Sequence, residues 1–206
     1  MRGASRAIEN EIRRMGYVHV AGVDEVGRGC LAGPVAAGAV VLHPDRYVAG
    51  IADSKVLTAA DRERLFSEIV EAAVCWHVAV VDVDDIDRLN IHRASLFAMQ
   101  QAVWALMPLP GFVISDAFRI PNLTMAQRPV VGGDRRSTAI AAASILAKVT
   151  RDRLMVELHT RDPRYGFDRH KGYATREHLA AMRRFGYSPV HRRTFRPSSL
   201  FDTISH

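Results

Sequence analysis

The chain has 206 residues and a mass of 22.8 kDa; 48% of the residues are hydrophobic and 24% are charged, which allows one sizeable folded domain and excludes a largely disordered chain. No stretch approaches the roughly 20 apolar residues of a membrane span, and the start of the chain has no apolar run typical of a secretion signal. Because Cys30 and Cys75 are the only cysteines, a disulfide framework and a CxxC zinc site are excluded as well, and we expect a soluble, cytoplasmic monomer with no membrane partner.

The first eighty residues predict three strands and two helices. β-branched apolar runs indicate the strands, and a glycine-rich turn separates the first two. The expected elements are a short helix over 5–15, strands over Val18–Val23 and Val35–Leu42, a helix from Thr58 to about Val74, and a strand over Trp76–Val81.

The remainder of the chain alternates helices and short strands, which is typical of an α/β fold with a mixed sheet. Small residues fill the first half of the long helix after Ser137, so we expect it to pack closely at the centre. The expected elements are a helix over Ile91–Met107, strands over Phe112–Ile114 and Val130–Val131, a helix from Ser137 through Thr160, and a helix over Thr175–Phe185. We expect a catalytic core over 1–160 and a basic helical segment over 161–206 packed on it, together forming one domain.

The positive charge is concentrated near the C-terminus. Residues 160–196 contain ten Arg or Lys residues and three acids, whereas the rest of the chain is nearly balanced. Of the 28 basic residues 25 are arginine, whose planar side chain fits phosphate, and aromatic residues lie between them. This pattern fits a nucleic-acid backbone and a solvated surface equally well. On the first interpretation, Arg192 and Arg193 contact the nucleic acid.

Four carboxylates lie at the ends of short apolar runs, next to turns: Asp24, Glu25, Asp116 and Asp134. Loops at strand ends are where α/β proteins assemble their sites. Convergent carboxylates without histidine or cysteine are hard oxygen ligands, which favour Mg²⁺ or Mn²⁺, and two such ions can drive phosphodiester cleavage.

For Glu25 and Asp134 the sequence also allows an interpretation other than direct metal binding. Adjacent residues of a strand point to opposite faces, so Asp24 and Glu25 share a site only if the strand breaks at Glu25, or if Glu25 acts through its backbone or a water. Asp134 precedes a helix, where a carboxylate often does no more than favour the helix N-terminus.

The segment Gly27-Arg28-Gly29 with Asp53 formally matches a dinucleotide-binding fingerprint. That fingerprint requires a helix after the glycines, whereas Val35–Leu42 predicts a strand, so we reject this interpretation. The glycines instead allow the backbone to pass close to a ligand, and Arg28 could reach a phosphate.

Four segments resemble motifs of the type 2 ribonuclease H (ribonuclease HII) family. They are Gly22–Pro34, Asp53-Ser54-Lys55, Ala142–Val149 followed by Arg151–Arg153, and His170–Thr175. The resemblance extends from about Gly22 to Pro197. It implies a ribonuclease H-like mixed sheet flanked by helices, with a C-terminal helical extension. It also implies Mg²⁺- or Mn²⁺-dependent hydrolysis of RNA in RNA–DNA hybrids, and incision 5′ of single ribonucleotides in duplex DNA that leaves 3′-hydroxyl and 5′-phosphate ends.

The same resemblance assigns roles to individual residues. The four acids named above correspond to the family's catalytic, metal-binding residues. Gly27, Arg28 and Gly29 match the loop that reads the ribose 2′-hydroxyl, Tyr173 the tyrosine that packs on the neighbouring deoxyribose, and Lys55 a lysine near the substrate phosphates. Two positions depart from many relatives. Ala117 replaces a glycine, which we expect to have little effect, and Gly132 replaces a lysine, for which Arg135 or Arg136 could substitute.

Two other functions fit parts of the sequence: a different ribonuclease H-like nuclease, such as a junction resolvase, and a nucleic-acid-binding protein without catalysis. The first leaves the glycine-arginine-glycine loop and Tyr173 unexplained, and the second leaves Asp24 and Asp116 unexplained beside a polyanion. Among other residues, we expect Asp152 to form a salt bridge and most histidines to have surface or capping roles. His170 is a further candidate for substrate contact.

Overall fold

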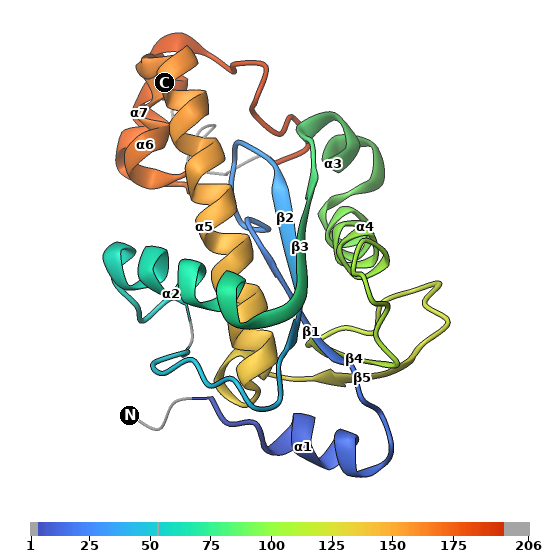
Figure 1. Ribbon diagram of the computed structural model, residues 1–206. Coiled ribbons are helices and arrows are strands. Elements are labelled where there is room, and N and C mark those ends of the chain that lie inside the picture. The colour runs from blue at the N-terminus through green and yellow to red at the C-terminus, as the bar shows by residue number, and fades with distance from the viewer. Residues whose placement is uncertain (1–3, 53, 196–206) are drawn as a thin grey trace.

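The computed structural model describes residues 4–52 and 54–195, and they form a mixed five-stranded sheet between two layers of helices (Figure 1). The order of the strands in the sheet is β3-β2-β1-β4-β5. The strands are β1 Val20–Val26, β2 Val35–Leu42, β3 Ala73–Val81, β4 Phe112–Asp116 and β5 Ala126–Val130. The α/β class and the mixed sheet expected from the sequence are confirmed.

Strand β1 is the centre of the sheet. It pairs antiparallel with β2 and parallel with β4, and β5 continues the parallel half. The carboxyl ends of β1 and β4 therefore lie at the same edge of the sheet. Pairing with β2 holds β1 in strand conformation up to Val26, three residues beyond the predicted end at Val23.

One face of the sheet is covered by α5 (Thr138–Arg161), with α1 (Ala7–Arg14) and α2 (Ala59–Ala72) on the same side. The other face is covered by α4 (Ile91–Trp104), preceded by α3 (Val83–Leu89). Figure 1 shows α5 running along the left side of the sheet, with α3 and α4 on the right. None of the helices in the described residues has the length and apolar character required to cross a membrane.

Helix α5 lies very close to the sheet, as its small residues predict. A Cβ atom on Gly22 would be 2.2 Å from the carbonyl carbon of Ala139, and one on Gly38 would be 2.3 Å from the carbonyl oxygen of Ala143. The side chain of Ser137 caps this helix by accepting a hydrogen bond from the Ile140 amide. Close contact between α5 and the sheet brings the helix next to the acidic ends of β1 and β4.

After α5 the chain forms a compact segment that packs on the C-terminal half of this helix. It contains η2 (Pro163–Tyr165), α6 (Phe167–His170) and α7 (Arg176–Phe185). Buried Tyr165 and Phe167 form a small core with Ala32 and Met155, so the segment also contacts the turn after β1. The helical character of the predicted segment is confirmed over residues 161–195, while residues 196–206 lie outside the described residues and the boundary at residue 160 stays a prediction.

Several elements differ from the predicted ones. The short helices α3 and α6 are absent from the prediction because each has only a few residues and no extended apolar period. Strand β5 shares only Val130 with the predicted Val130–Val131 and begins four residues earlier, at Ala126. An edge strand tolerates the Gln, Arg and Pro that make its sequence Ala-Gln-Arg-Pro-Val unlike a buried strand.

Candidate active site

Asp24 and Asp116 are neighbours on adjacent parallel strands. The register of β1 and β4 pairs Val23 with Ser115, and each acid is the next residue along its strand. Adjacent strands lie about 4.8 Å apart, and residues in register point to the same face. Both side chains therefore belong to the face that α5 covers, although the two residues are 92 positions apart in the sequence.

The hydrogen bonds around Asp24 come from its own strand and from α5. Its Oδ1 accepts the Glu25 amide at 2.8 Å, and the hydroxyl of Ser144 donates to its carboxylate. The Ser54 hydroxyl lies 3.0 Å from that of Ser144, so Ser54 donates its own hydrogen to Ser144. Ser144 is thus a site residue that the sequence reasoning did not assign, because it resembles any small residue of the helix face.

Glu25 lies on a regular part of β1, since the pairing with β2 continues to Val26. The strand does not break at Glu25, and its alternation places the Glu25 side chain on the opposite face from Asp24. Glu25 Oε1 accepts a hydrogen bond from Arg28 at 3.1 Å, and Oε2 is buried without a hydrogen-bond partner. The option that the strand breaks at Glu25 is therefore wrong, and the option that Glu25 acts through its backbone or a water stays a prediction.

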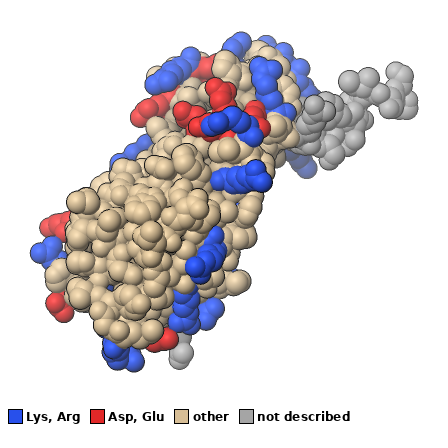
Figure 2. Space-filling view, turned by 90° about the vertical axis from the view of Figure 1, so that its right-hand side faces the viewer, with Lys and Arg blue, Asp and Glu red and all other residues tan. Residues whose placement is uncertain are grey.

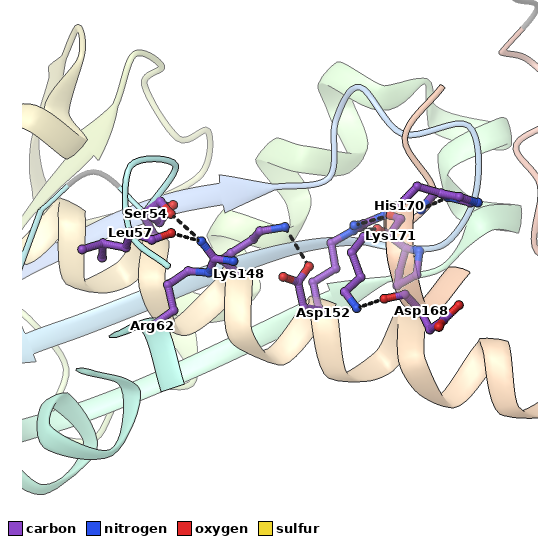
Figure 3. A network of polar contacts seen from close by, with 12 residues as sticks. Ser54, Leu57, Arg62, Lys148, Asp152, Asp168, His170 and Lys171 are labelled. Carbon is purple, nitrogen blue, oxygen red and sulfur yellow. Dashed lines mark hydrogen bonds and ion pairs between the residues drawn. The ribbon is translucent and has the colours of Figure 1, made fainter. Parts of the chain in front are cut away.

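Asp134 lies in the short helix η1 (Gly133–Arg135) and is 4% exposed. The Gly133 amide donates to Asp116 Oδ1 at 2.7 Å, which joins the turn carrying Asp134 to the end of β4. Lys55 Nζ lies 3.3 Å from Asp134 Oδ2. Arg62 of α2 donates to the carbonyls of Ser54 and Leu57, and so holds the segment that carries Lys55 (Figure 3). Asp53 lies outside the described residues.

The electrostatics of the site oppose full ionisation. Burial raises the pKa of Asp24 well above its usual range, and the charges on Glu25 and Asp116 raise it further. Burial also raises the pKa of Glu25, against the lowering effect of Arg28. Asp24, Glu25 and Asp116 thus interact as like charges in a desolvated place, where a cation would be stabilised.

Two buried arginines, Arg151 and Arg192, bind the backbone of residues 27–34, which connect β1 to β2 and are called the glycine loop below. Gly27 has φ +91°, and a Cβ there would lie 2.2 Å from Nε of Arg151. The Arg151 side chain donates hydrogen bonds to the carbonyls of Pro34, Lys171 and Ala32. The Arg192 side chain donates hydrogen bonds to the carbonyls of Gly33, Arg28 and Pro34. Irregular backbone has no ladder partner for its carbonyls, and the two guanidinium groups supply the missing donors.

The expectation that Arg192 contacts nucleic acid is therefore wrong. Its side chain is 0% exposed, and all three of its hydrogen bonds go to main-chain carbonyls. Arg193 is exposed, and its backbone amide donates to Asp87; the structure records no side-chain bond between Arg193 and the other described residues. The arginine count of the C-terminal segment thus includes a structural residue, because a guanidinium group satisfies several carbonyls at once.

Tyr173 lies beside the glycine loop. The Leu31 amide donates to the carbonyl of Gly172 at 2.8 Å, so the two segments are directly bonded. Burial raises the pKa of Tyr173, and its hydroxyl hydrogen-bonds with the thiol of Cys30. The ring is 40% exposed, and Lys148 Nζ is 5.7 Å from its centroid. The structure therefore brings Tyr173 and the glycine loop together, as expected from the sequence.

Two smaller expectations have clear outcomes. Asp152 pairs with Lys148 at 2.7 Å on α5, which confirms a salt-bridged helix residue (Figure 3). His170 is 8% exposed, and its two ring nitrogens contact the Tyr165 carbonyl and the Gly172 amide. It is a structural residue and not a substrate contact.

Figure 2 shows that the side of the molecule carrying α4 is largely uncharged in its lower part.

Ala117 has a strained backbone directly after Asp116. Its φ is +56°, in the left-handed region where a Cβ is unfavourable, and its amide is bound to the Val130 carbonyl. The alanine therefore carries a backbone strain that a glycine would not, and the expectation that it has little effect stays a prediction. We predict that Ala117→Gly increases the free energy of unfolding by about 0.5–1 kcal/mol, the usual scale of such strain less the added chain entropy. Urea denaturation at neutral pH measures this, and an unchanged or lower stability would contradict it.

Comparison with known proteins agrees with this arrangement. The family model described as Ribonuclease HII matches residues 21–198. A ribonuclease HII of Ralstonia nicotianae is 55% identical over 179 residues, which are 85% of this chain and 76% of that protein. The chain belongs to the ribonuclease HII family. Members of the ribonuclease HII family are endoribonucleases.

Two further similarities extend the comparison. A ribonuclease HII of an Anaeromyxobacter species is 53% identical over 189 residues. The matched region covers 92% of this chain but only 60% of that relative. The crystal structure of ribonuclease H2 from Pyrococcus horikoshii superposes with a TM-score of 0.73 at 27% identity, covering 86% of this chain and 94% of that one. The ribonuclease HII fold with its helical C-terminal region is thus confirmed.

Proposed function

We propose that this chain is a metal-dependent endonuclease that hydrolyses the RNA strand of RNA–DNA hybrids and incises 5′ of single ribonucleotides in duplex DNA, leaving 3′-hydroxyl and 5′-phosphate ends. The observation that carries the proposal is the placement of Asp24 beside Asp116, at the sheet edge that also bears the glycine loop and Tyr173. The cytoplasmic location and the monomeric state expected from the sequence stay predictions.

The donor set suits Mg²⁺ or Mn²⁺. Asp24, Glu25, Asp116 and Asp134 offer only carboxylate oxygens, and Oε2 of Glu25 is buried with no hydrogen-bond partner. Within the described residues, no three His, Cys, Asp or Glu side chains are already gathered closely enough to hold an ion. Asp24, Asp116 and Asp134 would bind an ion through their side chains, and Glu25 would contribute through its backbone or a water, because its side chain lies on the opposite face of the sheet from Asp24. When bound, a pair of divalent ions would lower the pKa of the attacking water and place positive charge beside the departing oxygen.

The remaining site residues select and position the substrate. The glycine loop presents backbone groups without side-chain bulk, which suits contact with a ribose 2′-hydroxyl that DNA lacks. The partly exposed ring of Tyr173 provides a flat surface for the adjoining deoxyribose. Lys55 is 78% exposed along its side chain and lies beside Asp134, a position from which a phosphate is within reach.

A cleavage assay tests this proposal. The substrates are a DNA duplex with one ribonucleotide, an RNA–DNA hybrid, an all-DNA duplex of the same sequence and a four-way DNA junction, each with Mg²⁺, Mn²⁺ or EDTA. We expect metal-dependent cleavage of the first two, with incision on the 5′ side of the single ribonucleotide. Junction cleavage indifferent to ribose would favour a resolvase-like nuclease, and tight binding with every strand intact would favour a binding protein.

Arg193 tests the role of the basic C-terminal segment. We predict that Arg193→Ala weakens hybrid binding and reduces the slope of log K against log salt by up to about 1, the value for one lost phosphate contact. Fluorescence anisotropy at several salt concentrations measures the slope. The matched control is Arg88→Ala, which removes an exposed arginine paired with Asp85 on α3. A slope equal to that of wild type would remove Arg193 from the interface.

A further inference from the structure

Three histidines form a buried cluster beneath the segment that carries Tyr173. His170 ends α6, His178 lies in α7, and His191 follows α7; they are 8%, 0% and 1% exposed. The rings of His170 and His178 stack with centroids 4.4 Å apart, and those of His178 and His191 are 5.1 Å apart. Neither the proposed chemistry nor the sequence pattern accounts for this cluster.

The hydrogen bonds that run from Ser188 through His191 and His178 to Tyr173 determine which ring nitrogen of each histidine carries the hydrogen. The Ser188 amide lies 2.9 Å from His191 Nδ1, and because an amide N–H only donates, this nitrogen is the acceptor. A neutral His191 then carries its hydrogen on Nε2, which lies 3.0 Å from Nε2 of His178. His178 accepts there, so its own hydrogen is on Nδ1, 2.9 Å from the carbonyl of Tyr173.

The third histidine binds the backbone of the residue before Tyr173. The Gly172 amide donates to His170 Nδ1 at 3.2 Å, so the hydrogen of His170 is on Nε2, 2.7 Å from the Tyr165 carbonyl. The peptide between Gly172 and Tyr173 also bonds to the glycine loop through the Leu31 amide. The peptide groups on either side of it are each bonded to an imidazole ring of defined tautomer, one through the Gly172 amide and the other through the Tyr173 carbonyl.

We propose that His178 and His191 are positioning residues that hold Tyr173 in place through a directed chain of hydrogen bonds from Ser188 to the Tyr173 carbonyl. This proposal rests on the proposed function in one respect, the contact of Tyr173 with the substrate. Burial lowers the pKa values of His178 and His191 to about 4, so both rings are neutral at physiological pH, as the chain requires. A protonated ring would place a hydrogen on a nitrogen that has to accept.

The tautomers can be observed without any substrate. Long-range ¹H–¹⁵N spectra of the labelled full chain at pH 7 distinguish a protonated from an unprotonated ring nitrogen. We expect His178 in the Nδ1–H form and His191 in the Nε2–H form. The same tautomer on both rings, or a doubly protonated ring, would overturn the proposal, whatever the enzyme cleaves.

Kinetics on DNA with one ribonucleotide tests the link to Tyr173. We expect His178→Phe to lower kcat/KM about tenfold, mainly through KM, and to add no further loss to Tyr173→Ala, because the two act as one unit. The amide of His178→Asn can still donate to the Tyr173 carbonyl, so we expect this variant to recover most of the lost kcat/KM. The control is His77→Phe, which changes an exposed histidine of β3. Independent losses in the double variant, or no difference between His178→Phe and His178→Asn, would overturn the proposal. If wild type cleaves none of the substrates, the proposed function fails, while the spectra still decide on the chain of hydrogen bonds.

Discussion

Asp24→Asn is expected to abolish cleavage and, in the same molecule, to stabilise the metal-free protein. Asp24 is 5% exposed, and burial together with the charges on Glu25 and Asp116 raises its pKa. One like-charge contact costs roughly 3–4 kcal/mol at 4–6 Å and an effective dielectric near 20. An amide of the same shape removes the charge and also a ligand for the metal. We therefore expect cleavage to fall by about 10³-fold or more, and the free energy of unfolding in EDTA to rise by about 1–3 kcal/mol.

The sign of the pH dependence follows from the same shift. A carboxyl whose pKa is raised on folding binds its proton more tightly in the native state, so its contribution to stability decreases as pH rises above 3.8. Asp24→Asn removes this contribution. The matched control is Asp85→Asn, which makes the same replacement of a carboxylate by an amide at a partly exposed acid on α3. A less stable Asp24→Asn protein in EDTA would contradict the picture of repelling carboxylates.

Acid is expected to destabilise the protein through the histidine cluster. Burial lowers the pKa values of His178 and His191 from 6.5 to about 4, so the unfolded chain binds more protons than the native state between these values. Their contribution to stability is complete above about pH 6.5 and is lost as pH falls toward 4. One such shift corresponds to about 3 kcal/mol for each ring.

Comparison of wild type with His178→Asn isolates this effect from that of the carboxylates. Urea denaturation at pH 7 and pH 4.5 gives the loss of stability for each protein. We expect wild type to lose more than the variant by up to about 3 kcal/mol, the contribution of one ring. His77→Asn, on the exposed face of β3, is expected to follow wild type. Equal losses in all three proteins would show that His178 is not held neutral by the fold.

The parts of the fold that follow from local rules could be predicted. Val35–Leu42 is a strand with the predicted bounds, because its apolar residues are buried on both faces. Thr58 and Ser137 cap helices, as their positions before periodic segments indicate. Asp24 and Asp116 could be paired as site residues because a carboxylate at the end of a short apolar strand has few structural uses.

The supports of the site could not be predicted, because they depend on tertiary contacts. Arg192 resembles its exposed neighbours in the sequence, and its role depends on carbonyls 158–164 residues away. His170, His178 and His191 have no metal-like spacing, and they meet only because α6, α7 and the following segment fold back on one another. The strain at Ala117 likewise appears only when the turn after β4 is seen.

Crystals of the wild-type chain soaked in Mn²⁺ and measured at the manganese absorption edge show whether Asp24 and Asp116 ligate one ion. We expect an anomalous peak about 2–2.4 Å from carboxylate oxygens of both Asp24 and Asp116. A saturating soak that leaves the space between these two acids without a peak, or a manganese ion bound elsewhere while both carboxylates stay unligated, would contradict it.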